Sequence, residues 1–456
     1  MTLCVLATIG CASLAPSDGA LPVVAVPQVW SAGGNGTAQG VAATSLAQWW
    51  LRFDDPLLTK LIEQSLHANT SVRTAQAALR QARAQVDVQS AGLLPSVGAS
   101  ASAQRSRASN NTGNTFQAGF DASWEPDVFG RLRSGVNASE ADARAAESSL
   151  ADVQVSLAAE VAVNYIELRG LQQRLIIARS NLASQQETLQ ITQWRLQAGL
   201  TTSLVTEQAR AAAEQTAAQI PSLEASLAQS RYSLAVLTGQ VPGALDTALA
   251  ASAPVPQPNA ELALAIPAET LRQRPDVRAA EQRIAAALAR VSQADAARYP
   301  SFSLGGSLGL RALTLGALSG GSAVTSALLG SVSIPLLDGG AARAQVRVQS
   351  AAVEQARVAY ETTVLTALQD VENALVALRG DRERLTRLVA AADAANNAAL
   401  LAQQRYSSGL IDFQAVLETQ RTLLSTQESV AITTAAVAAD QVRLYKALGG
   451  GWAVAE

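Results

Sequence analysis

The sequence predicts a mainly α-helical protein with a small β part, built from two copies of one unit. Three observations predict this fold class: an internal duplication, two long proline-free segments with helical spacing of apolar residues, and two pairs of segments in which apolar and small polar residues alternate. Leu94-Pro95-Ser96-Val97 returns as Tyr299-Pro300-Ser301-Phe302, and residues 195–200 return as 405–410. The copies lie roughly 205 to 211 residues apart, far beyond the 20–50-residue periods of solenoids. The repeated unit is therefore half of the protein.

The composition narrows the functional classes. Of 456 residues, 48% are hydrophobic and 16% charged, but only 4% are aromatic, so Ala, Val and Leu must form the core and helices can pack closely. A net charge of -3 offers no footprint for nucleic acid. One His, one Met and two Cys leave little for catalysis. We expect no enzyme activity, no metal and no cofactor, and we interpret His67 as a surface residue.

Both cysteines lie near the N-terminus, in an apolar run that ends in small residues, as the tail of a secretory signal does. Gly10-Cys11 looks like a lipoprotein cleavage site, at which Cys11 is acylated and becomes the new N-terminus. Residues 1–10 are then a signal peptide remnant and residues 11–48 a lipid-anchored tether. Thr8 stands where such sites usually carry Leu, and no basic residue precedes the run, so we expect that upstream residues are missing. The alternative is an incidental cysteine.

The first repeat, residues 49–240, begins with a helix. Asp55 followed by Pro56 is a helix start, because the acid can cap the helix and proline suits its first position. Leu and Val then recur at helical spacing until Pro95 stops the run. The pattern predicts one continuous helix of about 36 residues, roughly 54 Å long.

A β-hairpin is expected at residues 96–124, with its turn at 110–114, because apolar residues alternate with small polar ones on both sides of that turn. The second copy gives a hairpin at 301–335. Each strand has about 10 residues, which suits a tilted span of a bilayer. Four strands are too few to close a membrane barrel, for which eight is the usual minimum, so several subunits must pool their strands.

The remaining segments are helical. No proline interrupts the two long segments, which predicts helices of about 67 residues, or roughly 100 Å. Each should end at a glycine cap, and each returning helix should stack end to end on the first helix of its repeat. The expected elements are long helices at 131–198 and 341–407, return helices at 201–238 and 411–448, a linker at 241–268, and a second repeat at 269–450. No stretch has the ~18 consecutive apolar residues of a membrane-spanning helix.

Several motifs resemble the TolC-like outer-membrane efflux proteins, and most of all their NodT-type lipoprotein branch. These motifs are Trp49-Trp50 with Phe53, Asp55-Pro56, Leu61-Ile62, Arg274-Pro275-Asp276-Val277, Ala280-Glu281, Tyr299-Pro300, Gly199-Leu200 and Gly409-Leu410. The resemblance covers both repeats. It implies a homotrimer with a shared twelve-stranded β-barrel in the outer membrane, a trimeric α-helical barrel that forms a periplasmic tunnel, and an equatorial belt at the linker.

The resemblance also implies a function. The protein would be the outer-membrane channel of a tripartite efflux system, a passive conduit for small molecules, lying in the outer membrane and extending into the periplasm. A phosphate-binding loop is absent from the sequence, so a partner must supply the energy. The implied partners are a periplasmic adaptor protein, an inner-membrane resistance-nodulation-division (RND) transporter and outer-membrane lipids. The alternatives are the channel of a type I protein secretion system, a trimeric coiled-coil surface protein, and a diffusion porin.

The gate is expected at the two helical turns farthest from the strands. Threefold symmetry would turn each charged residue there into a ring, and a ring of carboxylates favours cations. The candidate gate and lumen residues are Glu418, Asp412, Tyr406, Arg405 and Glu207. The candidate adaptor contacts are Gly199, Leu200, Gly409 and Leu410. The alternatives are solvated helix faces for the charges and simple helix caps for the glycines.

Overall fold

The computed structural model describes residues 21–22, 24–27, 30–31, 46–108, 111–258 and 271–452. Cys11, the signal remnant at 1–10, most of the tether at 11–48 and the end of the linker lie outside these residues. The chain forms two compact units. A strand unit contains Ala77–Ser149 and Asp276–Thr363, and a helical unit contains Ala25–Gln76, Leu150–Pro275 and Val364–Glu456. Each is described by itself.

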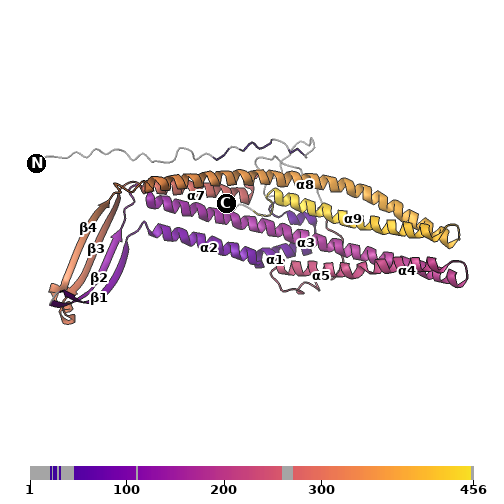
Figure 1. Ribbon diagram of the computed structural model, residues 1–456, viewed down its shortest axis with the longest axis horizontal. Helices are drawn as coiled ribbons and strands as arrows, with labels where there is room; N and C mark the ends of the chain where they lie inside the picture. The colour runs from indigo at the N-terminus through magenta and orange to yellow at the C-terminus, as the bar shows by residue number, and fades with distance from the viewer. Residues whose placement is uncertain are drawn as a thin grey trace. The chain divides into compact units, whose positions relative to one another are not determined.

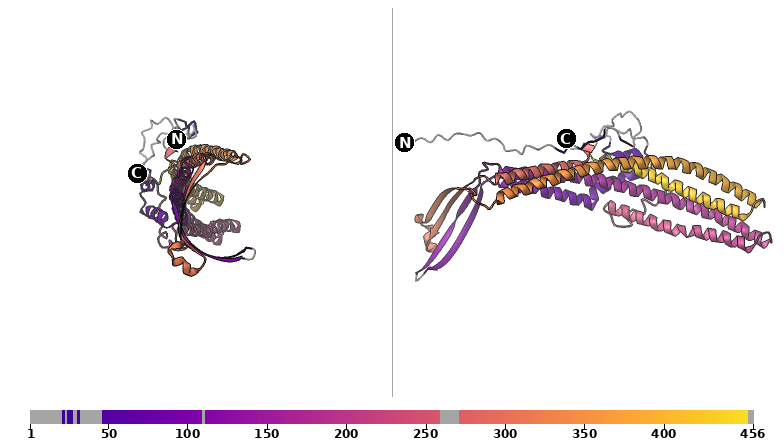
Figure 2. Two further views of the ribbon diagram at one scale, coloured as in Figure 1. Left: turned by 90° about the vertical axis from the view of Figure 1, so that its left-hand side faces the viewer. Right: turned by 45° about the horizontal axis from the view of Figure 1, so that its top comes forward.

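The strand unit holds one antiparallel sheet in the order β1-β2-β3-β4 (Figures 1 and 2). The strands are β1 (Ser96–Ala108), β2 (Asn111–Trp124), β3 (Ser301–Ala312) and β4 (Val324–Ser333), with short 3-10 turns η3 (Leu315–Ser319) and η4 (Gly321–Ala323) between the last two. The hairpins of the two repeats therefore join through pairing of β2 with β3. The sheet is strongly curved, as Figure 2 shows.

One face of this sheet is apolar and exposed. The register pairs Val97 with Ala122, and Phe120 with both Ala99 and Leu308. Because side chains alternate along a strand, these residues share one face. The face continues on β4, where Leu328 is 87% exposed. Small polar residues occupy the opposite face, on which the Ser303 and Ser331 hydroxyls lie 2.6 Å apart. A sheet with an apolar outer face and a polar inner face is the pattern of a membrane β-barrel.

The seam between the repeats depends on two paired glycines. Gly119 pairs with Gly309 where β2 meets β3. A Cβ atom on Gly119 would lie 2.8 Å from both the Gly309 Cα and the Leu308 carbonyl oxygen. A Cβ atom on Gly309 would lie 2.8 Å from the Ala118 oxygen. Any larger residue would force the two strands apart.

The predicted turn at 110–114 is wrong for most of its length. Asn111 pairs with Ala108, and the ladder continues without a bulge through Gly113, which pairs with Ser106. The segment has turn-forming residues, but the cross-strand hydrogen bonds decide its conformation. Intrinsic strand preference is weaker than such pairing.

The helices have the following bounds: α1 Pro56–Ala68, α2 Thr70–Ala91, α3 Arg131–Gln197, α4 Ser203–Ala217, α5 Gln219–Leu237, α7 Pro275–Ala296, α8 Ala341–Ser407 and α9 Phe413–Ala447. A 3-10 turn, η2 (Trp49–Phe53), precedes α1. The long helices α3 and α8 each have 67 residues. Among the described residues, none of the helices combines the length and hydropathy required to cross a membrane.

Matching aspartates begin both long helices. The Asp127 carboxylate accepts hydrogen bonds from the backbone N–H groups of Leu132 and Arg133 at 3.0 and 2.8 Å. The Asp338 carboxylate accepts from Gly340 and Ala342, both at 2.8 Å. The Ala342 and Gly340 donors hold the pKa of Asp338 below its ordinary value, because they stabilise the ionised form.

The prediction of one continuous first helix is wrong, because Asn69 separates α1 from α2. Its backbone is extended, with a ψ of 139°. Its side-chain oxygen accepts from the Ser71 N–H at 2.7 Å and so starts α2. The first return helix is also interrupted, between α4 and α5. Pro221 lies just after the interruption and cannot donate the hydrogen bond that would continue the helix to the Ala217 carbonyl.

Short and returning helices meet end to end, as the sequence predicted. The Asn69 side-chain amide donates to the Leu237 carbonyl, the last of α5, at 2.9 Å. At the equivalent point of the second repeat, Arg274 Nη1 donates to the Ala447 carbonyl, the last of α9, at 2.7 Å. Both joints satisfy a carbonyl that the helix itself leaves unpaired.

Aromatic residues and one buried polar network fix the middle of the helical unit. Trp49 is fully buried and stacks on Tyr445 at 5.3 Å. Asp55 accepts a hydrogen bond from the Tyr165 hydroxyl at 2.7 Å, and Arg169 donates to the same hydroxyl at 2.8 Å. Arg169 also donates to the Ala251 carbonyl at 2.7 Å, which attaches the linker to α3. Burial is the main cause that raises the pKa of Tyr165.

Candidate functional site: the helical tips

The two turns at the ends of the long helices have the same geometry. Gly199 and Gly409 adopt φ angles of +70° and +76°, which favour glycine. The Leu200 N–H donates to the Arg195 carbonyl, and the Leu410 N–H donates to the Arg405 carbonyl, both at 2.8 Å. These bonds close each helix in the manner of a Schellman cap. The predicted cap role of both glycines is thus seen in the structure.

Both leucines at the turns point into solvent. A leucine at this position of the cap commonly packs back onto its own helix. Leu200 is instead 68% exposed and Leu410 74% exposed. Apolar side chains displayed at matching turns are available for contact with another molecule.

A small core joins four helices behind the turns. Tyr406 on α8 is only 5% exposed, and its ring lies 5.8 Å from that of Phe413 on α9. Ala209 on α4 and Val416 on α9 belong to the same core. The resemblance placed Tyr406 at the lumen, whereas the structure buries it. The Tyr-Ser-Ser-Gly turn places this ring on the apolar side of α8, where Phe413 covers it.

Arg195 connects the two turns. Its guanidinium lies 4.6 Å from the centre of the Tyr406 ring, and Nη1 donates to the Tyr406 carbonyl at 2.7 Å. Arg195 belongs to the last turn of α3 and Tyr406 to the last turn of α8. Burial raises the pKa of the Tyr406 hydroxyl, and the Arg195 charge opposes this. Within the described part of the chain that hydroxyl has no hydrogen-bond partner.

The charged candidates lie on the surface. Asp412 is the N-cap of α9 and accepts from the Ala415 N–H at 3.1 Å. Glu207 lies 3.7 Å from Arg210, its neighbour on α4. Arg405 and Glu418 are exposed. The structure therefore gives Asp412 a capping role and Glu207 a local ion pair, and it brings neither into contact with Arg195.

A buried polar seam between α3 and α9 escaped the sequence analysis. Gln420 donates to Thr188 at 3.0 Å, and the Asn181 amide donates to Gln427 at 2.8 Å. Thr188 and Asn181 are seven residues apart, as are Gln420 and Gln427, so the seam follows a heptad. These polar residues interrupt the apolar pattern at regular intervals, which is the signal that could have revealed the seam.

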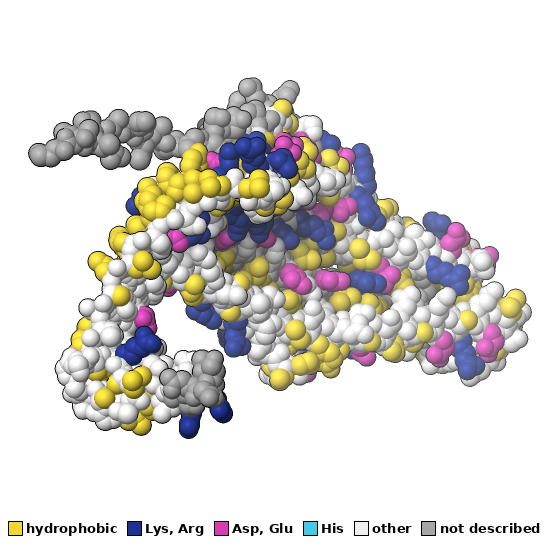
Figure 3. All heavy atoms as spheres, turned by 60° about the vertical axis from the view of Figure 1, so that its left-hand side comes forward, with side chains coloured by type: hydrophobic (Ala, Val, Ile, Leu, Met, Phe, Trp, Pro, Cys, Tyr) yellow, Lys and Arg dark blue, Asp and Glu magenta, His cyan; other side chains and the backbone are white. Residues whose placement is uncertain are grey.

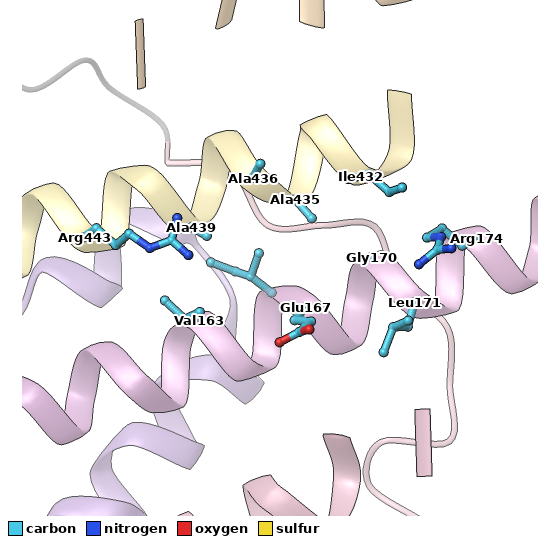
Figure 4. Close-up of a pocket in the computed structure, with 11 residues that line it drawn as sticks. Val163, Glu167, Gly170, Leu171, Arg174, Ile432, Ala435, Ala436, Ala439 and Arg443 are labelled. Atoms are coloured by element: carbon cyan, nitrogen blue, oxygen red, sulfur yellow. The ribbon is translucent and has the colours of Figure 1, made fainter. Parts of the chain in front are cut away.

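A groove of about 280 Å³ lies farther along the same two helices (Figure 4). Its floor is the point where Gly170 approaches Ala435, and a Cβ on Gly170 would lie 3.0 Å from the Ala435 Cβ. Figure 4 shows Arg174 and Arg443 at opposite ends of the groove. Arg443 Nη1 is held by Asp440 at 2.5 Å. No group of three or more potential metal ligands occurs among the described residues.

Comparison with known proteins identifies the class. The sequence model of the family described as outer membrane efflux protein matches residues 61–240 and 266–450. The pyoverdine export outer membrane protein OpmQ of Pseudomonas putida is 34% identical over 443 residues, covering 94% of this chain and 93% of OpmQ. Nodulation protein T of Rhizobium leguminosarum bv. viciae is 31% identical, with coverage of 96% and 90%.

The solved structures agree. The outer-membrane channel OprN is 35% identical with a TM-score of 0.85, and the superposition covers 95% of this chain and 99% of that one. The chain therefore belongs to the outer membrane efflux protein family. It has the fold of the TolC-like trimeric channels and is an outer-membrane channel component of an efflux pump. Proteins of this family and fold are channels rather than enzymes.

Proposed function

We propose that the protein is a passive conduit for small molecules, and that its helical tips form a periplasmic gate held closed by Arg195. The single observation that carries the gate is the contact of Arg195 with both the ring and the carbonyl of Tyr406. This contact ties the α3–α4 hairpin to the α8–α9 hairpin, so a wider opening between the hairpins requires that it break. The polar seam between α3 and α9 lies directly behind it.

The exposed charges of the tips supply the electrostatics of the gate. In a trimer, Glu418, Asp412 and Glu207 each form a ring of three carboxylates, and Arg405 forms a ring of three cations. The carboxylate rings favour cations at a narrow pore, and Arg405 can form ion pairs with carboxylates of neighbouring subunits. The double change Glu418→Ala with Asp412→Ala is expected to raise single-channel conductance in planar bilayers and to lower cation selectivity. Unchanged values would remove both residues from the gate.

The exposed leucines at the tips form the contact for a periplasmic adaptor. Leu200 and Leu410 occupy equivalent turns, so a trimer presents six similar apolar contacts. An adaptor would join the channel to an inner-membrane RND transporter, which supplies the energy. When expressed in a deletion strain, the double variant Leu200→Ser with Leu410→Ser should fail to restore drug resistance. The conductance of the purified variant channel should stay normal. Val241→Ser, an equally exposed apolar site in the linker, serves as the matched control.

Small-molecule efflux is preferred to type I protein secretion because the matching family is described as outer membrane efflux protein and one of the relatives is named for pyoverdine export. Deletion of the gene should increase susceptibility to several drugs or dyes. If susceptibility is unchanged and a secreted protein is lost from the medium instead, the secretion function replaces efflux.

The lipid anchor is proposed at Cys11, with the tether following it. The apolar run that reaches Gly10-Cys11 supports acylation at that thiol. In a version with a complete signal, Cys11→Ser should abolish incorporation of labelled palmitate. Cys4→Ser is the matched control and should leave labelling intact. Labelling that persists without Cys11 would refute the assignment.

A further inference from the structure

Two arginines lie on the apolar face of the sheet, beyond the end of its apolar band. The β1–β2 ladder runs without a bulge from the Ser96 pair to the Ala108 pair. Side chains two residues apart share a face, so Arg105 and Arg107 project from the same face as Val97 and Ala103. On this face of β1, two arginines thus follow the apolar residues.

Among the described residues, the surroundings of these two arginines offer no anion. Both side chains are exposed, and their register partners, Asn114 and Thr112, are uncharged residues. Neither arginine makes an ion pair within the described residues. Arg131, at the other end of the strand unit, differs because it binds Glu125 at 2.7 Å. Figure 3 shows Lys and Arg side chains at the hairpin end of the strands, where few other charged groups occur.

The depth of the two arginines fits the headgroup layer of a membrane. On the neighbouring strand the apolar band runs from Phe116 to Trp124, roughly 27 Å at ~3.4 Å per residue. For a strand tilted by ~40°, that length rises about 21 Å through the membrane, near the ~25 Å apolar band of outer-membrane barrels. Arg105 and Arg107 lie two and four residues past Ala103, which places them about 5 and 10 Å above the band for a strand tilted by ~40°. The layer of headgroups begins there.

We propose that Arg105 and Arg107 bind the phosphate groups of an anionic lipid in the outer leaflet of the outer membrane. The helices of this channel family extend into the periplasm, so the hairpin ends of the strands face the outside. Arginine binds phosphate through two parallel N–H donors and is always charged. The outer face is already in contact with lipid through its apolar residues, and phosphorylated lipid A carries the matching charge. The inference rests on the outer-membrane location and does not depend on the gate.

The experiment compares the trimer in nanodiscs of phosphatidylcholine with and without bisphosphorylated lipid A, and native mass spectrometry measures retained lipid A. Each neutralised arginine near an anionic surface should weaken binding about fivefold, so Arg105→Gln with Arg107→Gln should weaken it roughly thirtyfold. Arg311→Gln is the matched control, because Arg311 is exposed at the same end of the sheet but belongs to the opposite, polar face. Conductance should be unaffected in the double variant.

Several outcomes would overturn the proposal. Undiminished retention of lipid A by the double variant would do so, as would an equal loss in Arg311→Gln, because nonspecific attraction would then explain the binding. Displacement of lipid A by millimolar inorganic phosphate would indicate a site for a soluble anion instead. If the double variant does not assemble, the single changes Arg105→Gln and Arg107→Gln are measured separately, and each must lose about fivefold.

Discussion

Replacement of Arg195 by alanine should open the channel. The Arg195 side chain donates a charged hydrogen bond to the Tyr406 carbonyl at 2.7 Å, which is worth about 1.5–3 kcal/mol. Its guanidinium also lies 4.6 Å from the centre of the Tyr406 ring, a contact worth about 0.5–1 kcal/mol at a partly exposed site. Water recovers part of this when the side chain is lost, so about 2 kcal/mol per subunit is a reasonable estimate. If the three subunits open together, the closed state loses about 6 kcal/mol of stability relative to the open state. A change of about 5.5 kcal/mol is enough to move a two-state equilibrium from 1:99 to 99:1.

The assay is single-channel conductance of the purified trimer in planar bilayers. Arg195→Ala should convert a mostly closed channel into a mostly open one, and Arg195→Lys should fall between, because a lysine keeps the charge but loses the planar contact with the ring. Arg179→Ala is the control, since Arg179 lies on the same helix, is 59% exposed at its side chain and pairs with Glu224, which is not a gate candidate. Conductance of Arg195→Ala equal to that of the wild type would refute the proposal that Arg195 holds the gate closed.

Two further predictions concern assembly and pH. Gly119→Val should greatly reduce the yield of trimers that survive gel electrophoresis, because its Cβ would lie 2.8 Å from the Gly309 Cα. Gly113→Ala, with open space around its Cβ, should assemble normally. Equal yields would contradict the close packing of β2 against β3 at the two glycines. Burial raises the pKa of the Asp440 carboxyl; the Arg443 charge opposes this shift and Asp381 adds to it. The folded state therefore binds the carboxyl proton more tightly than the unfolded state does. The free energy of unfolding consequently falls as the pH rises through the raised pKa. Asp440→Asn should therefore denature at a higher temperature than the wild type at pH 7, with a difference that shrinks towards pH 4; a difference independent of pH would disprove this.

The sequence was sufficient to predict the long helices and the hairpins, because their signals are local and repeated. A proline-free run with regular leucines has few alternatives to a helix. The break at Asn69 was missed because the residues around it keep helical spacing, and the carbonyl that holds the Asn69 side-chain amide belongs to Leu237, far away in the sequence. The turn of the first hairpin was misplaced because pairing between strands overrides the local preference of Asn111 and Gly113.

The candidate site was only partly predictable for a related reason. The glycine caps follow from local sequence, but the burial of Tyr406 depends on Phe413 and on helices from the other repeat. Arg195 lies in the repeated segment 195–200 but was not among the candidate gate residues. Its contact with Tyr406 joins residues 211 positions apart, which a single sequence does not reveal. The sequence shows the type and charge of each residue at the tips, but it does not show which side of its helix packs against the neighbouring helices.

The duplication also predicts how the gate should open. Arg195 and Arg405 are equivalent residues, and so are Leu196 and Tyr406. The Tyr406 carbonyl accepts from Gly409 at 2.9 Å as well as from Arg195, and the Leu196 carbonyl accepts from Gly199 at 3.0 Å. In a trimer of duplicated chains, Arg405 would meet the Leu196 carbonyl of the next subunit by the same geometry. That contact lacks an aromatic ring, so the Arg405 contact between subunits should be weaker than the Arg195 contact within each subunit.

Opening should therefore begin at the boundaries between subunits. Leu196→Tyr would supply the missing ring beneath Arg405, adding about 0.5–1 kcal/mol per boundary. The variant should lower open probability in bilayers, and Leu196→Tyr combined with Arg405→Ala should return it to the wild-type level or above. Leu196 is 37% exposed, so the larger side chain has room. If Leu196→Tyr conducts like the wild type while Arg195→Ala opens the channel, the two boundaries are not equivalent, and the neighbouring subunit holds the gate by other contacts.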